Sequence, residues 1–270
     1  MRRFALGHGL RAVWYQRRFQ SLCDCESHYS VLQAYGFIHR AMDRVLQQLI
    51  ANSTGEVQFF DIGANVGFVS LLACSHAPHR VHAHCFEPNP MAAQWLHEHA
   101  AMNPFNMTIN VYALGDAAGK LTMTLGRESS NSTLVPGGFA EVSGVGTTEV
   151  EVKTLDAYCA EYGVTPTIAK LDVEGFEPHV LRGSTRTLTT KRPILVVEVN
   201  SKALAAGGSS AIGLLGQIEQ FGYHTYLIDP RQVEMAINDR RARPQWRGYP
   251  EVRREDFNVS RLCDVLAIPE

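Results

Sequence analysis

The sequence has no long hydrophobic run and no marked excess of charge of either sign. No segment approaches the roughly 20 consecutive apolar residues of a membrane span, and the basic residues 1–20 lack the continuous apolar core of an export signal. The net charge over 270 residues is −2, which gives no reason to expect nucleic acid or an anionic membrane as a partner. These absences predict a cytoplasmic protein with neither of those partners.

Cysteine is also scarce. The six cysteines are too few and too dispersed for a disulfide framework. Cys23 and Cys25 form a C-x-C pair, but no second pair lies nearby to complete a metal site. The 11 histidines are scattered rather than placed at the spacings of metal ligands. We therefore predict neither a disulfide scaffold nor a structural metal centre.

Short apolar segments alternate with helical segments over most of the chain. The predicted strands lie at 57–61, 81–89, 107–114, 167–173, 193–200, 223–229 and 261–269. An order of strand, helix, strand is typical of a parallel, doubly wound sheet with helices on both faces. The sequence therefore predicts an α/β fold with a Rossmann-like sheet.

Two regions depart from this order. Residues 28–50 place apolar side chains at helical spacing, which predicts an N-terminal helical extension. Segments 120–126 and 147–156 alternate like antiparallel strands, so we predict an inserted β-hairpin. Its Gly- and Ser-rich connection is a long loop of the kind that often carries function. The predicted division is a helical extension over 1–52 and the main domain over 53–270.

The segment "FFDIGANVGFVSLLAC" is the first candidate binding motif. A glycine turn between a strand and a helix exposes backbone N–H groups that can hold a polar ligand. The spacing of Gly63 and Gly67 is not the G-x-G-x-x-G of a dinucleotide site. Asp61 stands directly before the turn, where a carboxylate is a poor neighbour for a pyrophosphate. An acid in this place suits a ligand that carries a cationic amine.

A second acid follows the next predicted strand. Glu87 stands where a carboxylate can accept hydrogen bonds from both hydroxyls of a ribose. Asp61 and Glu87 together favour a nucleoside ligand with an ammonium group and no phosphate, which fits S-adenosyl-L-methionine better than NAD, FAD or ATP. The alternative is that Asp61 only caps the following helix and that Glu87 is a solvated acid.

Five segments, read in order, resemble the FkbM-type S-adenosylmethionine-dependent methyltransferases. They are "FFDIGANVGFVSLLA", "HCFEPNP", "VYALGD", "TLDAY" and "IAKLDVEGFEPHVLRG", within residues 57–200. The resemblance implies a seven-stranded sheet, parallel except for one strand, that binds the cofactor at the carboxyl ends of its strands. It also implies methyl transfer to a hydroxyl group of a small molecule such as a sugar or natural product.

The resemblance also implies which residues bind the cofactor. The turn would line the methionine part, the acid after the second strand would bind the ribose, and the acid of "ALGD" would lie near the adenine. These residues are Asp61, Gly63, Ala64, Asn65, Gly67, Glu87, Pro88 and Asp116.

Three acids at the ends of adjacent strands are the candidate catalytic residues. Alternation along "AKLDVEG" places Lys170 and Asp172 on one side of the strand, and Glu174 continues the series. Glu198 ends the apolar strand "PILVVEV" and should reach the same crevice. We predict that Asp172, Glu174 and Glu198 orient and deprotonate the acceptor. Lys170 is expected to form an ion pair with a nearby acid.

Some alternatives stay open on this evidence. The acids could hold a divalent cation, because carboxylates suit Mg²⁺, but this is the less favoured hypothesis. The methyl acceptor could be a carboxylate or a nitrogen. A binding module without catalysis is disfavoured because all the motifs are present, and an NAD-dependent oxidoreductase is disfavoured by the turn.

A few other polar residues are weaker candidates. His179 is expected on the surface of the helix after the acids, although it could act as a base. His28 and Tyr29 could line the acceptor site. Ser129, Ser130 and Ser132, in the inserted loop, could reach the substrate or the cofactor.

Overall fold

The computed structural model describes residues 10–24, 39–126, 132–136, 146–228 and 262–270. Within these residues a seven-stranded sheet runs in the order β11-β12-β10-β9-β3-β4-β5. Its strands are β3 (Val57–Ile62), β4 (Val81–Phe86), β5 (Asn106–Asn110), β9 (Ile168–Leu171), β10 (Ile194–Asn200), β11 (Tyr223–Ile228) and β12 (Leu262–Pro269). Only β12 is antiparallel to its neighbours in this sheet. The predicted fold class is confirmed.

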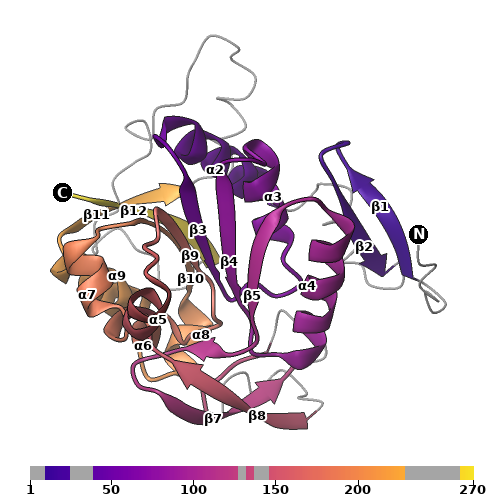
Figure 1. Cartoon of the computed structure of the whole chain (residues 1–270). Helices are drawn as coiled ribbons and strands as arrows, with labels where there is room; N and C mark the ends of the chain where they lie inside the picture. Colours follow the sequence, from indigo (N-terminus) through magenta and orange to yellow (C-terminus); the bar gives the residue numbers. More distant parts are fainter. Residues whose placement is uncertain (1–9, 25–38, 127–131, 137–145, 229–261) are drawn as a thin grey trace.

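Most residues of the central strands are buried, because helices cover both faces of the sheet. Successive residues point to opposite faces, so Phe59 and Phe60 of β3 enter two different hydrophobic clusters. The face of Phe59 is covered by α2 (Arg40–Asn52), α3 (Phe68–His76) and α4 (Pro90–Met102). The face of Phe60 is covered by α5 (Leu155–Tyr162), α6 (Glu177–Arg182), α7 (Thr185–Thr190), α8 (Ser201–Ala206) and α9 (Ala211–Gln220). Figure 1 shows these two groups of helices around the sheet.

The inserted hairpin is present and belongs to a second, three-stranded sheet. Its strands are β6 (Ala113–Leu114), β7 (Gly119–Leu125) and β8 (Gly146–Lys153), in the order β6-β8-β7. The strand predicted at 107–114 therefore divides between the two sheets. The strand predicted at 147–156 ends early, because the Thr154 side chain accepts a hydrogen bond from the Ala157 N–H and so begins helix α5.

The N-terminal region differs from the prediction in one respect. Residues 10–24 form an antiparallel hairpin of β1 (Leu10–Tyr15) and β2 (Phe19–Asp24), and the predicted helix is described from Arg40 onward. The hairpin was missed because its turn has Gln16 and Arg17 at φ 46° and 61°. Such turns are usually signalled by Asn or Gly, and neither stands there.

The hairpin packs against the same core as the main sheet. Tyr15 and Phe19 contact Phe68 of α3, with ring centroids 5.2 and 5.4 Å from it. Arg18 donates two hydrogen bonds to the Asp43 carboxylate, at 2.8 and 2.9 Å, and one to Ser75 Oγ at 2.6 Å. These contacts attach the β1–β2 hairpin to α2 and α3. The predicted division between an N-terminal extension and the main domain at residue 52 stays a prediction.

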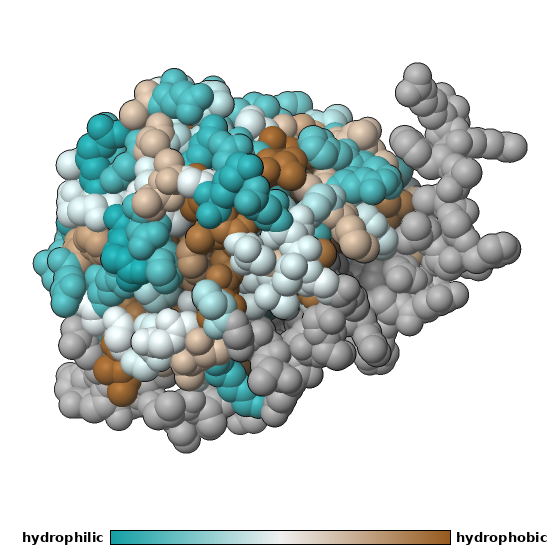
Figure 2. Space-filling model, turned by 90° about the horizontal axis from the view of Figure 1, so that it is seen from below, coloured by the Kyte–Doolittle hydropathy of each residue, from teal (hydrophilic) through white to brown (hydrophobic). Residues whose placement is uncertain are grey.

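The described surface carries no large hydrophobic face in the view from below. Figure 2 shows hydrophobic residues in separate patches among hydrophilic ones. Among the residues that the structure describes, no helix is both long and apolar enough to cross a membrane.

The hairpin contact gives a test of stability. We expect Arg18→Met to lower the free energy of unfolding by about 2 kcal/mol, because the buried Asp43 carboxylate loses two charged hydrogen bonds and keeps its contact with His76. Arg44→Met on α2 is the matched control, since within the described residues Arg44 makes a single exposed hydrogen bond, to Gln47. Urea unfolding of both variants measures the difference, and equal losses would contradict the anchoring role.

Candidate functional site

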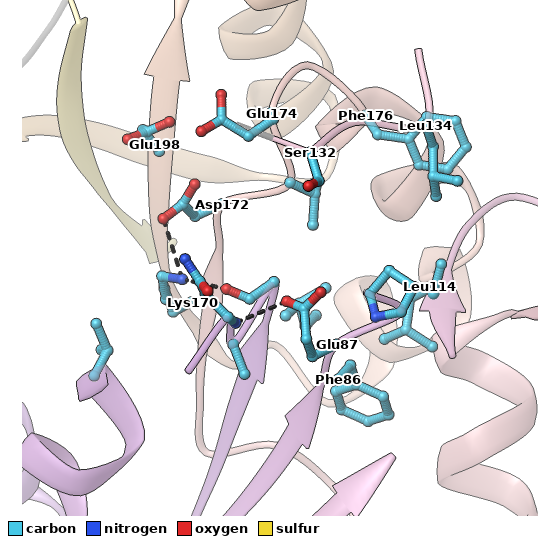
Figure 3. A pocket seen from close by; sticks show the side chains of 18 of the residues that line it. Phe86, Glu87, Leu114, Ser132, Leu134, Lys170, Asp172, Glu174, Phe176 and Glu198 are labelled. Atoms are coloured by element: carbon cyan, nitrogen blue, oxygen red, sulfur yellow. Dashed lines mark hydrogen bonds and ion pairs between the residues drawn. The ribbon is translucent and has the colours of Figure 1, made fainter. Parts of the chain in front are cut away.

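The carboxyl ends of β3, β4 and β9 meet at a pocket of about 410 Å³. The first residues after these strands are Gly63, Glu87 and Asp172. In Figure 3 the acids Asp172, Glu174 and Glu198 lie at one end of the pocket. Glu87 lies on the opposite side from them, next to an apolar wall.

The glycine turn has a steric cause. Gly63 has φ +80°, and a Cβ there would lie 1.8 Å from the Asp172 carbonyl oxygen. The N–H groups of Gly63 and Ala64 both donate to the Phe86 carbonyl oxygen at 3.0 Å. The ends of β3, β4 and β9 therefore approach too closely for any side chain at residue 63. Gly67, at φ +82°, packs against Leu96 and does not line the pocket.

Lys170 is a buried cation at the centre of the site, with 4% of its surface exposed. Its Nζ donates to the Gly63 carbonyl oxygen at 2.8 Å and lies 3.2 Å from both Asp61 Oδ1 and Asp172 Oδ2. Burial alone would lower the pKa of Lys170, but the charges of Asp172 and Asp61 outweigh it and hold the pKa above its usual range. The expected ion pair is present, with two partners.

Asp61 lies behind the pocket rather than in its wall. It is fully buried, and its Oδ2 accepts a hydrogen bond of 2.6 Å from Ser70 Oγ. Asp61, Lys170 and Asp172 together carry one net negative charge. Without Asp61 the pair of Lys170 and Asp172 would be neutral, so Asp61 makes this wall of the pocket attractive to a cation.

Backbone N–H groups fix the carboxyl group of Glu87. Its two carboxyl oxygens accept hydrogen bonds from the Asn65 N–H at 2.7 Å and the Asn89 N–H at 2.8 Å. Burial raises the pKa of Glu87 to about 7, although the two N–H groups act in the opposite direction. Each oxygen keeps a second lone pair that can accept a hydrogen bond from a ligand. Ala64, Asn65 and Pro88 also line the pocket.

The three predicted catalytic acids come together as expected from the sheet. One carboxyl oxygen of each lies within 4.8 Å of the others, a separation at which a divalent cation could also be held. Burial, with the nearby charge of Asp172, raises the pKa of Glu174 to about 8 and that of Glu198 to about 10. Asp264 of β12 stands opposite Glu198 in the strand register and contributes to the second shift. Glu174 and Glu198 are therefore largely protonated at neutral pH.

An apolar wall closes the other end of the pocket. It consists of Phe86, Leu114, Met123, Leu134 and Phe176. These side chains come from β4, from the inserted sheet and its loop, and from the segment that leads into α6 (Figure 3). A flat aromatic group is the kind of ligand that such a wall accepts.

Asp116 does not line the pocket. Its Oδ2 lies 3.1 Å from His179 Nδ1 and accepts a hydrogen bond of 3.3 Å from Arg182. All three side chains are exposed at the surface, which agrees with the surface position expected for His179. The predicted role of Asp116 near adenine stays untested.

Several pocket residues were missed from the sequence. Asn200 lies two positions after Glu198 on β10, and the alternation of the strand could have identified it. His39 immediately precedes α2, with φ 64°, and lines the pocket. It belongs to no sequence motif, so no pattern indicated this position. Burial and the charge of Lys170 lower its pKa to about 4. Ser132 was a candidate and lines the pocket, whereas His28, Tyr29, Ser129 and Ser130 lie outside the described residues.

Comparison with known proteins identifies the family of this fold and site. The model of the methyltransferase FkbM domain matches residues 61–225, more than half of the chain. The chain belongs to the FkbM methyltransferase family. The match begins at Asp61 and extends past Glu198, so it includes the carboxyl ends of β3, β4, β9 and β10.

Individual relatives are distant. The hexuronic acid methyltransferase AglP of Haloferax volcanii is 24% identical over 163 residues, which cover 60% of this chain and 64% of AglP. Methyltransferase FkbM from Methylobacillus flagellatus is 14% identical, with a TM-score of 0.46, over 78% of this chain and 43% of that one. An O-methyltransferase from Thermotoga maritima is 10% identical, with a TM-score of 0.40, over 84% and 64%.

The acid cluster predicts an unusual pH dependence of stability. The folded state raises the pKa of Glu198, so this group stabilises the fold fully below the ordinary glutamate value and progressively less as the pH rises toward 10. Glu198→Gln is neutral at every pH. The variant should therefore have a higher free energy of unfolding than the wild type, and this difference should be about 3 kcal/mol larger at pH 7 than at pH 5.

Urea unfolding at the two pH values measures this gain. Glu161→Gln, at an exposed position of α5, is the control and should change little at either pH. An effect of Glu198→Gln that is the same at both pH values would show that the carboxyl group ionises normally.

Proposed function

We propose that this protein is an S-adenosylmethionine-dependent methyltransferase that transfers the methyl group to a hydroxyl of a small molecule. The observation that carries the proposal is the division of one pocket into two parts. Glu87 and the apolar wall form one part, and Asp172, Glu174 and Glu198 form the other. Membership of the FkbM family supports it.

The first part suits the nucleoside of the cofactor. The free lone pairs of Glu87 would accept the two ribose hydroxyls, and the apolar wall would receive the adenine. The methionine end would lie against the turn of Gly63, Ala64 and Asn65, near Asp172. The negative charge shared by Asp61, Lys170 and Asp172 favours a ligand with a sulfonium and an ammonium group. When bound, the cofactor supplies the electrophilic methyl group.

The second part suits an acceptor hydroxyl. The oxygens of Asp172, Glu174 and Glu198 converge on one region, where they would orient the hydroxyl and take its proton. A base works best when its pKa lies near the working pH, and the pKa of about 8 brings Glu174 closer to it than an ordinary carboxylate. These roles require no divalent cation, so chelation by EDTA should leave the rate unchanged.

A carboxylate acceptor is the second candidate, and one observation favours it. The raised pKa values leave Glu174 and Glu198 largely protonated at neutral pH, so both can donate hydrogen bonds to a carboxylate. The relative AglP acts, by its name, on a hexuronic acid, a sugar that offers hydroxyl groups and a carboxylate. Hexuronic acids are therefore the first acceptors to screen.

Binding of the cofactor can be tested without an acceptor. We expect S-adenosylmethionine and S-adenosylhomocysteine to bind in calorimetry, and NAD not to bind. Glu87→Gln should weaken both adenosyl ligands about tenfold or more, because it removes a charged hydrogen-bond acceptor. Glu161→Gln is the control with unchanged affinity. Absence of binding to either adenosyl ligand would refute the proposed function.

The pH dependence of transfer distinguishes the two acceptors. With a hydroxyl acceptor the base must be ionised, so the rate should rise with pH and level off above about 8 as Glu174 loses its proton. With a carboxylate acceptor the protonated form is needed, so the rate should fall over the same interval. Transfer from radiolabelled S-adenosylmethionine to glucuronic acid, and to glucose as its counterpart without a carboxylate, measures the two profiles.

Glu174→Gln provides the matching variant. It should lower transfer to a hydroxyl by about 100-fold or more while leaving cofactor affinity unchanged. Transfer to a carboxylate should persist, because the amide still donates a hydrogen bond. Full activity on a hydroxyl acceptor would exclude Glu174 as the base.

A further inference from the structure

Glu174 has a left-handed backbone conformation, which residues other than glycine rarely adopt. Its φ is +53°, and Gly175 follows at φ +94°. A residue other than glycine seldom adopts this left-handed region unless its surroundings hold it there. Gly175 is confined because a Cβ would lie 2.4 Å from the Ala203 carbonyl oxygen.

One group comes from the inserted loop. Thr133 Oγ1 donates a hydrogen bond of 2.8 Å to the carbonyl oxygen of Glu174. The backbone of Thr133 is itself fixed, since it exchanges two hydrogen bonds with Thr124 of β7, at 2.9 and 3.0 Å. Thr133 is almost completely buried. It therefore connects the inserted sheet directly to the turn that carries Glu174.

The other group comes from the start of α6. Glu177 Oε1 accepts hydrogen bonds from the N–H of Val173, at 2.9 Å, and of Gly175, at 3.3 Å. These two N–H groups stand on either side of Glu174. Glu177 has 1% of its surface exposed, and its Oε2 has no hydrogen-bond partner among the described residues. Burying a carboxyl group costs free energy, and here a single oxygen, Oε1, accepts both hydrogen bonds. We therefore assign Glu177 a structural role in this turn rather than a role in solubility.

We propose that Thr133 and Glu177 are positioning residues that hold Glu174 in its left-handed conformation, so that its carboxyl group stays beside Asp172 and Glu198. Thr133 fixes the carbonyl side of the turn, and Glu177 fixes the N–H groups that flank it. Asn200 Nδ2 lies 3.4 Å from Glu174 Oε2 and orients the carboxyl group itself. Thr133 thereby acts on acceptor chemistry through Glu174. The role in transfer rests on the function proposed above.

The same loop segment also reaches the opposite side of the pocket. Ser132 Oγ accepts hydrogen bonds from Asn89 Nδ2, at 3.1 Å, and from the Gly126 N–H, at 3.2 Å. The Asn89 N–H in turn donates to Glu87. Ser132 and Thr133 are adjacent, so one short segment contacts the residues behind both parts of the pocket.

Hydrogen exchange tests the positioning role without an acceptor. In Thr133→Val the amides of Val173 and Gly175 should exchange about tenfold faster than in the wild type, although Thr133 does not bond to either of them. Thr133→Ser keeps the hydroxyl and should restore slow exchange. Glu177→Gln keeps the accepting oxygen, so the same two amides should also exchange slowly in that variant. In Glu177→Leu they should exchange faster. The amides of β3 are the internal control and should be unchanged in every variant.

Turnover then separates positioning from general stability. Thr133→Val should lower kcat for methyl transfer to glucuronic acid by about tenfold or more and leave the Kd for S-adenosylhomocysteine within about twofold. The positioning role would be overturned if the amides of Thr133→Val exchanged at wild-type rates. It would also be overturned if Thr133→Ser lost as much kcat as Thr133→Val. A wild-type protein that binds neither adenosyl ligand would instead refute the proposed function, and the exchange result would stand by itself.

Discussion

The buried ammonium group of Lys170 is the interaction on which the site depends. It joins the ends of β3 and β9 by contacting Asp61, Asp172 and the Gly63 carbonyl oxygen. A cation enclosed in this way needs both carboxylates, because its burial would otherwise cost several kcal/mol. The contact fixes where the glycine turn lies relative to the strand end that bears Asp172. It also leaves one net negative charge at the wall of the pocket.

The acids around this centre illustrate how burial changes chemistry. Asp172, Glu174 and Glu198 have similar side chains in the sequence, yet the partly buried Glu174 and Glu198 have pKa values raised to about 8 and 10. Crowding of like charges in a poorly solvated place disfavours ionisation of all but one or two of them. A pKa of about 8 lets Glu174 exchange a proton near neutral pH, which an ordinary glutamate does not do.

The inserted sheet was easy to predict as an element and hard to predict in its effect. Alternation in 120–126 and 147–156 indicated the hairpin, and its antiparallel register is present. Nothing in those segments indicated that Leu114 and Met123 would line the pocket or that Thr133 would bond to Glu174. Contacts between residues 41 positions apart depend on how the loop returns across the sheet, and local patterns do not specify that path.

The sequence alone determined the order of the strands of the main sheet along the chain, the glycine turn and the acids at the strand ends, because each is a local pattern with a local cause. Parallel strands end at one edge, so Glu87, Asp172 and Glu198 had to meet there. The tertiary structure alone decided that Asp61 lies behind the wall, that Asp116 faces outward, and that His39 and Asp264 join the site. These placements follow from packing between distant segments and from charge burial, which exist only once the sheet has formed.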